Sequence, residues 1–110
     1  MISQRAQTAF KRGQEWETRR NSSKAVNAYR EAIAIEPDWL EPRQRLGMIY
    51  LDQGRYDEAA AVYWQAQPLT PSGDGSIDHL LHTIDMIQKG ALTPAAYRYY
   101  VMALELPDEK

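Results

Sequence analysis

Hydrophobic and polar positions recur with a helical period along most of the chain. Within the first 18 residues, small and aromatic side chains fall three or four positions apart, which places them on one face of a helix: Ala6, Ala9, Phe10, Gly13 and Trp16. Five further segments show apolar positions of the same kind between turn residues. We therefore predict six helices, over about residues 3–18, 23–35, 38–54, 56–67, 76–90 and 93–107.

Capping residues and prolines mark the ends of these segments. Ser22 or Ser23 is expected to cap the second helix, and Asp38 to cap the third, with Glu41 at the spacing of a capping box. Pro37 ends the second helix, because the residue before a proline avoids helical geometry. The run from 71 to 75 is the one long turn-rich loop.

The first pair of segments is repeated 34 residues later. Gly13, Trp16, Ala25, Tyr29, Ala32 and Pro37 return, with the same or similar side chains, as Gly47, Tyr50, Ala59, Tyr63, Ala66 and Pro71. A weaker third copy follows at a spacing of 36, in Gly90, Ala95, Tyr99, Met102 and Pro107. The two extra residues belong either to the loop at 73–76 or to the fifth helix. A fixed period near 34 is typical of a helix-turn-helix repeat array.

These residues resemble the signature of the tetratricopeptide repeat family. The second repeat matches it best, although Arg43 replaces the large first residue, and the first repeat departs at Ala9 and Arg12. The resemblance implies an all-α superhelix, a helix-turn-helix solenoid of three repeats and six helices. It also implies one domain over residues 1–110, with repeats at about 6–39, 40–73 and 76–109.

The repeated small residues have a packing explanation. Gly13 and Gly47 are expected where the two helices of one repeat approach most closely, since glycine has no side chain to keep them apart. The space between the small residues is then filled by Trp16, Tyr29, Tyr50 and Tyr63.

The resemblance also implies a binding surface. In such arrays the first helices of successive repeats line a concave groove that holds another protein or a peptide. The positions left free by the signature are Phe10, Gln14, Glu17, Gln44, Met48 and Leu51, with His82 as a candidate in the third repeat. The Lys, Asn and Arg clamp with which one subtype holds chaperone tails is absent, so chaperone-tail binding is not expected.

The last predicted helix has a second apolar face, formed by Tyr97, Tyr100, Val101 and Leu104. A helix that is apolar all round is normally covered on both sides. We therefore expect this face to be covered by a second copy in a homodimer or by further chain. The alternatives to a peptide-binding adaptor are thus a regulatory or targeting domain of a larger enzyme and a homo-oligomerisation module.

Composition narrows the function. The net charge is -2, with a basic first half and an acidic second half, which indicates either solvated helix faces or a charged partner. The absence of cysteine is compatible with a reducing cytoplasm, where we expect the protein to reside. No stretch reaches the ~20 apolar residues of a membrane span. The basic residues carry few interleaved aromatics, so nucleic-acid binding is not expected.

Candidate chemistry is sparse. His79 and His82 lie three positions apart, flanked by Asp78 and Asp85, but the chain has no third histidine and no HExxH motif. The glycines at 73 and 75 lack the GK[ST] ending of a phosphate loop. Without a nucleophile–base pair or a metal set, we expect no enzyme activity, no metal and no cofactor.

Overall fold

The computed structural model describes residues 1–70, 75–90 and 93, and every regular element in these residues is helical. The elements are α1 (Gln4–Thr18), α2 (Ser22–Ile35), α3 (Leu40–Asp52), α4 (Tyr56–Ala66), the short 3-10 turn η1 (Gln67–Leu69) and α5 (Ser76–Gln88). Five predicted helices are therefore present within a few residues of their predicted bounds. The predicted sixth helix, at 93–107, falls almost entirely outside the described residues.

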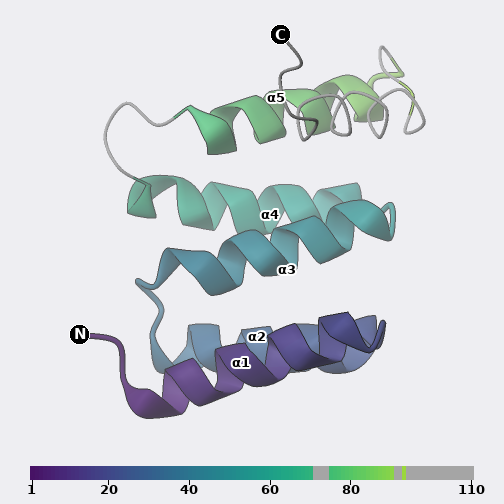
Figure 1. Cartoon of the computed structure of the whole chain (residues 1–110). Coiled ribbons are helices and arrows are strands. Elements are labelled where there is room, and N and C mark those ends of the chain that lie inside the picture. The colour runs from purple at the N-terminus through teal and green to yellow at the C-terminus, as the bar shows by residue number, and fades with distance from the viewer. Residues whose placement is uncertain (71–74, 91–92, 94–110) are drawn as a thin grey trace, which may run out of the picture.

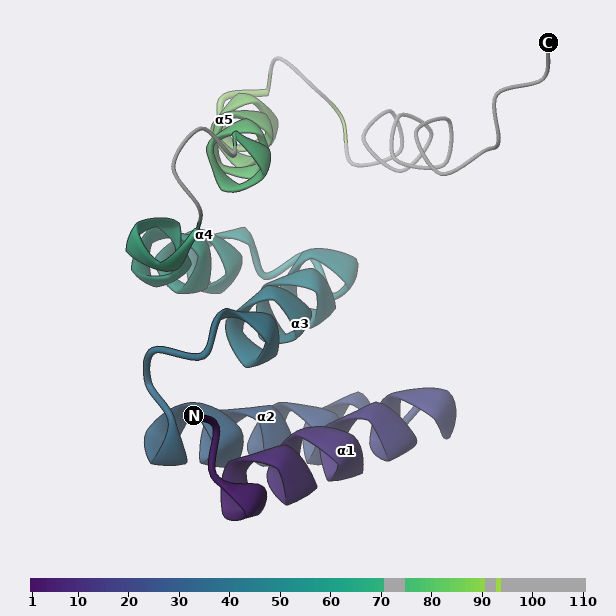
Figure 2. The ribbon, with the colours of Figure 1, turned by 60° about the vertical axis from the view of Figure 1, so that its left-hand side comes forward.

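The helices stack in the order in which they occur in the sequence. Figures 1 and 2 show α1 beside α2 and α3 beside α4, with α5 beyond α4. Contacts join α1 to α2, α2 to α3, α3 to α4 and α4 to α5. Two hydrogen bonds tie α5 to the preceding elements, from the Gln67 side chain to Asp78 and from the Gln88 side chain to Asp57. The predicted all-α, helix-turn-helix solenoid class is confirmed.

Glycine allows the two helices of each pair to approach closely. A β-carbon placed on Gly13 would lie 2.5 Å from Tyr29 Cε1, and one placed on Gly47 would lie 2.6 Å from Tyr63 Cζ. Both distances are far below van der Waals contact. The expectation that these glycines mark the closest approach is confirmed, and in each pair the neighbour is the repeat's tyrosine.

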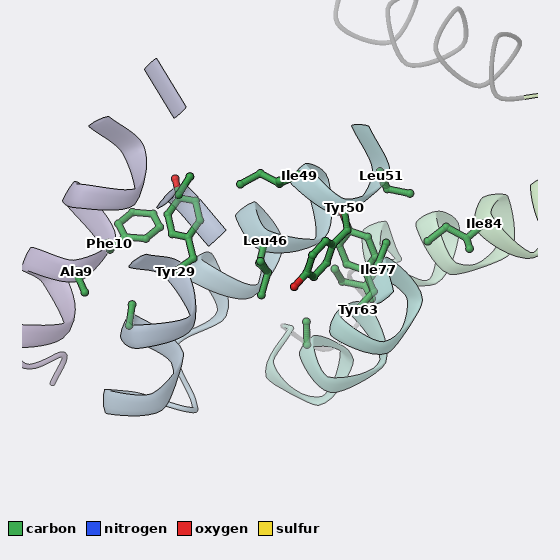
Figure 3. Close-up of a cluster of buried hydrophobic side chains, with 14 residues drawn as sticks. Ala9, Phe10, Tyr29, Leu46, Ile49, Tyr50, Leu51, Tyr63, Ile77 and Ile84 are labelled. Atoms are coloured by element: carbon green, nitrogen blue, oxygen red, sulfur yellow. The ribbon is translucent and has the colours of Figure 1, made fainter. Parts of the chain in front are cut away.

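One buried cluster runs through the stack (Figure 3). Its first part joins α1, α2 and the start of α3, because the Phe10 ring lies 5.5 Å from Tyr29 and 4.9 Å from Trp39, centroid to centroid. Its second part gathers Tyr50, Tyr63 and Ile77 from the later helices. Each helix pair therefore buries its apolar face against its neighbours, as a repeat array requires.

Two predicted caps are wrong. Asn21, one residue before the serines, caps α2 by accepting a hydrogen bond from the Lys24 amide at 3.2 Å. The capping position of α3 is occupied by Trp39, which makes no side-chain cap bond. Because α3 begins at Leu40, Asp38 lies one residue too early to reach the free amides of the first turn.

The register of the fifth helix follows from its two ends. Helices α3 and α5 each have 13 residues, and both their first and last residues are offset by 36 positions. The residues that follow the C-caps of α1, α3 and α5 are Arg20, Gly54 and Gly90, with positive φ angles of 59°, 72° and 78°. The three helices therefore end alike, and the two extra residues of the third repeat lie before Ser76.

Candidate functional site

Two adjoining hollows cross the face shared by α1 and α3. One is lined by Gln14, Glu17, Thr18 and Arg45, and the other by Glu41, Gln44, Arg45 and Met48. Because Arg45 lines both, the hollows meet at this residue in a strip that reaches from α1 to α3. We call this strip the α1–α3 groove and define it by these seven residues.

Four of the sequence-predicted binding residues meet in this groove. Gln14 and Glu17 come from α1, while Gln44 and Met48 come from α3. Met48 is 40% exposed, which is unusual for a long apolar side chain, so its thioether is open to a partner. The structure thus brings together side chains that lie about 30 positions apart in the sequence.

Phe10 and Leu51 do not belong to this surface, which corrects the sequence-based prediction. Phe10 is only 8% exposed, because it fills the space between α1, Tyr29 and Trp39. Leu51 is 5% exposed and is part of the same buried cluster. Removing a large aromatic or aliphatic side chain from water is more favourable than displaying it in a groove.

His82 also lies away from the groove. It lines a separate hollow between α4 and α5, beside Trp64 and Leu81. The 36-residue offset aligns His82 with Leu46 rather than with Gln44 or Met48, which explains the misplacement. The predicted end surface of Tyr97, Tyr100, Val101 and Leu104 lies outside the described residues.

A hydrogen bond fixes one wall of the groove. The Tyr29 hydroxyl donates to Glu17 Oε1, which joins α2 to α1 beneath the hollow. Burial first, and this bond to Glu17 second, raise the pKa of Tyr29 far above its ordinary value, while the charge of Arg45 acts in the opposite sense. Glu17 is therefore a half-buried hydrogen-bond acceptor that Tyr29 keeps in place. The Arg45 side chain lines the same hollow.

Arg45 is the groove residue that sequence reasoning missed. It is exposed, and a lone exposed arginine is usually a solvated charge. The helical spacing indicates its position, because Arg45 lies four residues after Glu41 and three before Met48 and so shares one face of α3 with them. Its place between the hollows makes it the centre of the groove.

The groove offers hydrogen bonding and an adaptable apolar contact, without reactive chemistry. The amides of Gln14 and Gln44 both donate and accept, and the Arg45 guanidinium provides N–H donors in a planar fork. The flexible Met48 thioether adapts to apolar side chains of different shapes. This combination suits the exposed backbone of an extended peptide.

In the described part of the chain, no group of three histidine, cysteine, aspartate or glutamate side chains could hold a metal ion. No helix there is long and apolar enough to cross a bilayer.

Comparison with known proteins gives one match. Residues 20–73 match the family model of the tetratricopeptide repeat, a stretch that covers α2, α3, α4 and η1. No curated protein and no solved structure matches the chain.

Proposed function

The chain belongs to the tetratricopeptide repeat family through residues 20–73, and we propose that it is an adaptor that holds an extended segment of a partner protein in the α1–α3 groove. Repeats of this family generally mediate protein–protein interaction and are typically not enzymes themselves. A cytoplasmic location and the absence of catalysis are parts of this proposal.

The continuity of the groove through Arg45 is the observation that carries the proposal. An extended peptide has unpaired backbone N–H and C=O groups along its length, and these need partners when they leave water. Gln14 and Gln44, on opposite sides of Arg45 in the strip, provide both donors and acceptors. Their side chains are half-buried, so less rotamer freedom is lost on binding than at a fully exposed amide.

The charges of the groove favour a partner segment of mixed character. Glu17 and Glu41 lie on either side of Arg45, so the strip contains both signs. A strongly acidic segment meets two carboxylates, and a strongly basic one meets the guanidinium. We therefore propose a segment that places one acidic or carbonyl group at Arg45 and an apolar side chain at Met48.

The test is affinity capture from a lysate of the source organism. The wild type is compared with a groove variant, Gln44→Ala, Arg45→Ala and Met48→Ala, whose positions leave the buried cluster untouched. A control variant, Asn27→Ala and Glu31→Ala, removes exposed side chains of α2 that do not line the groove.

We expect the wild type and the control variant to capture a partner protein that the groove variant does not capture. Capture by all three proteins would contradict a groove-bound partner. Circular dichroism of each variant establishes that it is folded.

A homo-oligomerisation module is the second candidate, and the exposed Trp64 favours it. Its side chain is 60% exposed beside the hollow that contains His82, and an exposed indole is common at interfaces. Multi-angle light scattering of the wild type and of Trp64→Ser tests this candidate. A dimer that dissociates in the variant would support self-association, whereas a monomeric wild type would exclude it.

A further inference from the structure

Another hollow lies on the side of α3 that faces away from the α1–α3 groove. It measures about 290 Å³ and is enclosed by α2, α3 and α4. We call it the outer hollow and define it by its polar lining residues, Arg30, Arg43, Tyr50, Glu58 and Gln65. Arg43 of the outer hollow and Arg45 of the groove are two residues apart, which turns them about 200° from one another around the helix axis.

Arg43 has two buried donors that no described residue satisfies. Its Nε and Nη1 atoms are buried and have no hydrogen-bond partner among the described residues. A buried donor without a partner is costly, and the cost is greater when the group is charged. The side chain is half-buried, so it is not a freely solvated surface arginine either. A hydrogen-bond acceptor from another molecule would satisfy these two Arg43 donors.

Arg30 places a second guanidinium at the same hollow. Its Nη2 atom donates to the Tyr50 hydroxyl at 2.7 Å, which joins α2 to α3 and holds the guanidinium in position. The Tyr50 hydroxyl accepts this bond and keeps its own proton for another acceptor. Arg30 is otherwise exposed, so its remaining N–H groups are open to a ligand.

The one carboxylate of the outer hollow is already engaged. Glu58 accepts hydrogen bonds from both Nε and Nη2 of Arg55, in the bidentate arrangement typical of guanidinium and carboxylate. The charge of Glu58 is therefore largely balanced by Arg55, which does not line the hollow. Arg30 and Arg43 remain as two positive charges without an ion-pair partner among the described residues.

We infer that the outer hollow is a second binding site, which takes an acidic side chain of a partner protein and holds its carboxylate between Arg30 and Arg43. A planar carboxylate accepts two parallel N–H bonds from a guanidinium, so it fits this donor set. The apolar wall formed by Ile33, Leu46 and Val62 covers the methylene groups of an aspartate or glutamate side chain. Nε and Nη1 of Arg43 are buried in the free protein, so this binding mode requires a rotation of the Arg43 side chain toward the hollow that it lines.

This site is distinct from the groove of the proposed function. The two sites share no lining residue and lie on different sides of α3. A failure of the groove proposal therefore leaves this inference standing, and the reverse also holds, because each has its own variants.

The test is an NMR titration of the full chain labelled with nitrogen-15. The probes are a blocked tetraglutamate peptide, sodium acetate and inorganic phosphate, all at one constant ionic strength. The acetate and phosphate arms separate a carboxylate site from a phosphate site. The variants are Arg43→Gln and Arg30→Gln, and the matched control is Arg5→Gln, an exposed arginine of α1 that lines neither the outer hollow nor the groove.

We expect saturable shifts at the side-chain N–H groups of Arg30 and Arg43 with the peptide, and weaker ones with acetate. Either Arg43→Gln or Arg30→Gln should weaken peptide binding about tenfold, since each removes one charge-assisted pair. Arg5→Gln should bind as the wild type does. The second variant tests the site even if one substitution disturbs folding.

Three results would overturn the inference. Shifts that rise without saturation would show general ionic attraction instead of a site. Equal affinity of the wild type, Arg43→Gln and Arg30→Gln for the peptide would show that the two guanidiniums do not bind it. Saturation by phosphate without saturation by the peptide would overturn the assignment to an acidic side chain.

Discussion

Gly47 lies directly against the ring of Tyr63, so that a β-carbon at residue 47 would be 2.6 Å from Tyr63 Cζ. Gly13 and Tyr29 repeat this relationship in the first helix pair. Tyr63 is fully buried between the helices. The closest approach of α3 and α4 therefore depends on the absence of a side chain at one position.

Gly47→Ala should lower the free energy of unfolding by about 1–3 kcal/mol, because the added methyl group overpacks the helix contact. The higher helix propensity of alanine, worth about 1 kcal/mol, offsets only part of this loss. The measurement is urea unfolding followed by circular dichroism. Gly75→Ala is the control, since a β-carbon there meets no atom within 4 Å and should leave stability unchanged. Equal stability of both variants would show that the Tyr63 ring does not lie against residue 47.

Arg20→Gly should raise the free energy of unfolding by about 0.5–1 kcal/mol. Arg20 adopts a φ of 59° after the end of α1. The equivalent residues after α3 and α5 are Gly54 and Gly90. This left-handed geometry is unfavourable for a residue with a β-carbon and accessible to glycine. The matched reverse change, Gly54→Ala, should lower the melting temperature. A fall in stability on Arg20→Gly would contradict this account of the helix end.

Arg43→Leu should stabilise the free protein by about 1–3 kcal/mol, because it replaces a half-buried guanidinium with two unsatisfied donors by an apolar side chain. Arg45→Leu, at an exposed position, should change stability by less than about 0.5 kcal/mol. Thermal unfolding of the two variants beside the wild type is the measurement. If Arg43→Leu destabilises the chain, Arg43 has a structural partner and the donors are satisfied in solution.

Phe10→Ala should lower the free energy of unfolding by about 3–5 kcal/mol, since it removes a buried ring that packs on Tyr29 and Trp39. Met48→Ala should have an effect below about 1 kcal/mol, because Met48 is 40% exposed and lies outside the buried cluster. Chemical unfolding of both variants separates core residues from groove residues. Similar losses in the two variants would contradict this division.

Stability should fall as the pH rises above the ordinary tyrosine pKa of about 10. The pKa of Tyr29 is raised in the folded state, so the unfolded chain loses its proton first and is favoured at high pH. The contribution of Tyr29 is fully present below about pH 10 and declines above it. Melting temperatures between pH 8 and pH 11 should fall less steeply for Tyr29→Phe than for the wild type. Parallel curves would show that the Tyr29 pKa is not raised in solution.

The sequence carries the local part of this structure well. Helices α1 to α5 follow from apolar spacing and from the prolines and glycines between them, because these signals act within a few residues. The 34-residue repeat predicts the solenoid, and the repeated glycines predict a close approach of the two helices in each pair. That Tyr63 is the residue against Gly47 is seen only in the structure. Gln14, Glu17, Gln44 and Met48 were found as groove residues by the resemblance to the family.

The tertiary structure decided which side of each helix remains open. Phe10 is drawn into the core by Trp39, a residue 29 positions away that no local pattern connects to it. His82 leaves the groove because the two extra residues lie before α5, and only the ends of that helix reveal their place. Arg45 and Arg43 look alike in the sequence. Arg45 lines two open hollows, whereas Arg43 has two buried donors without a partner in the part of the chain that the structure describes. Periodicity is a property of one helix, whereas burial is a property of the neighbours that pack on it, and those neighbours come from distant parts of the chain.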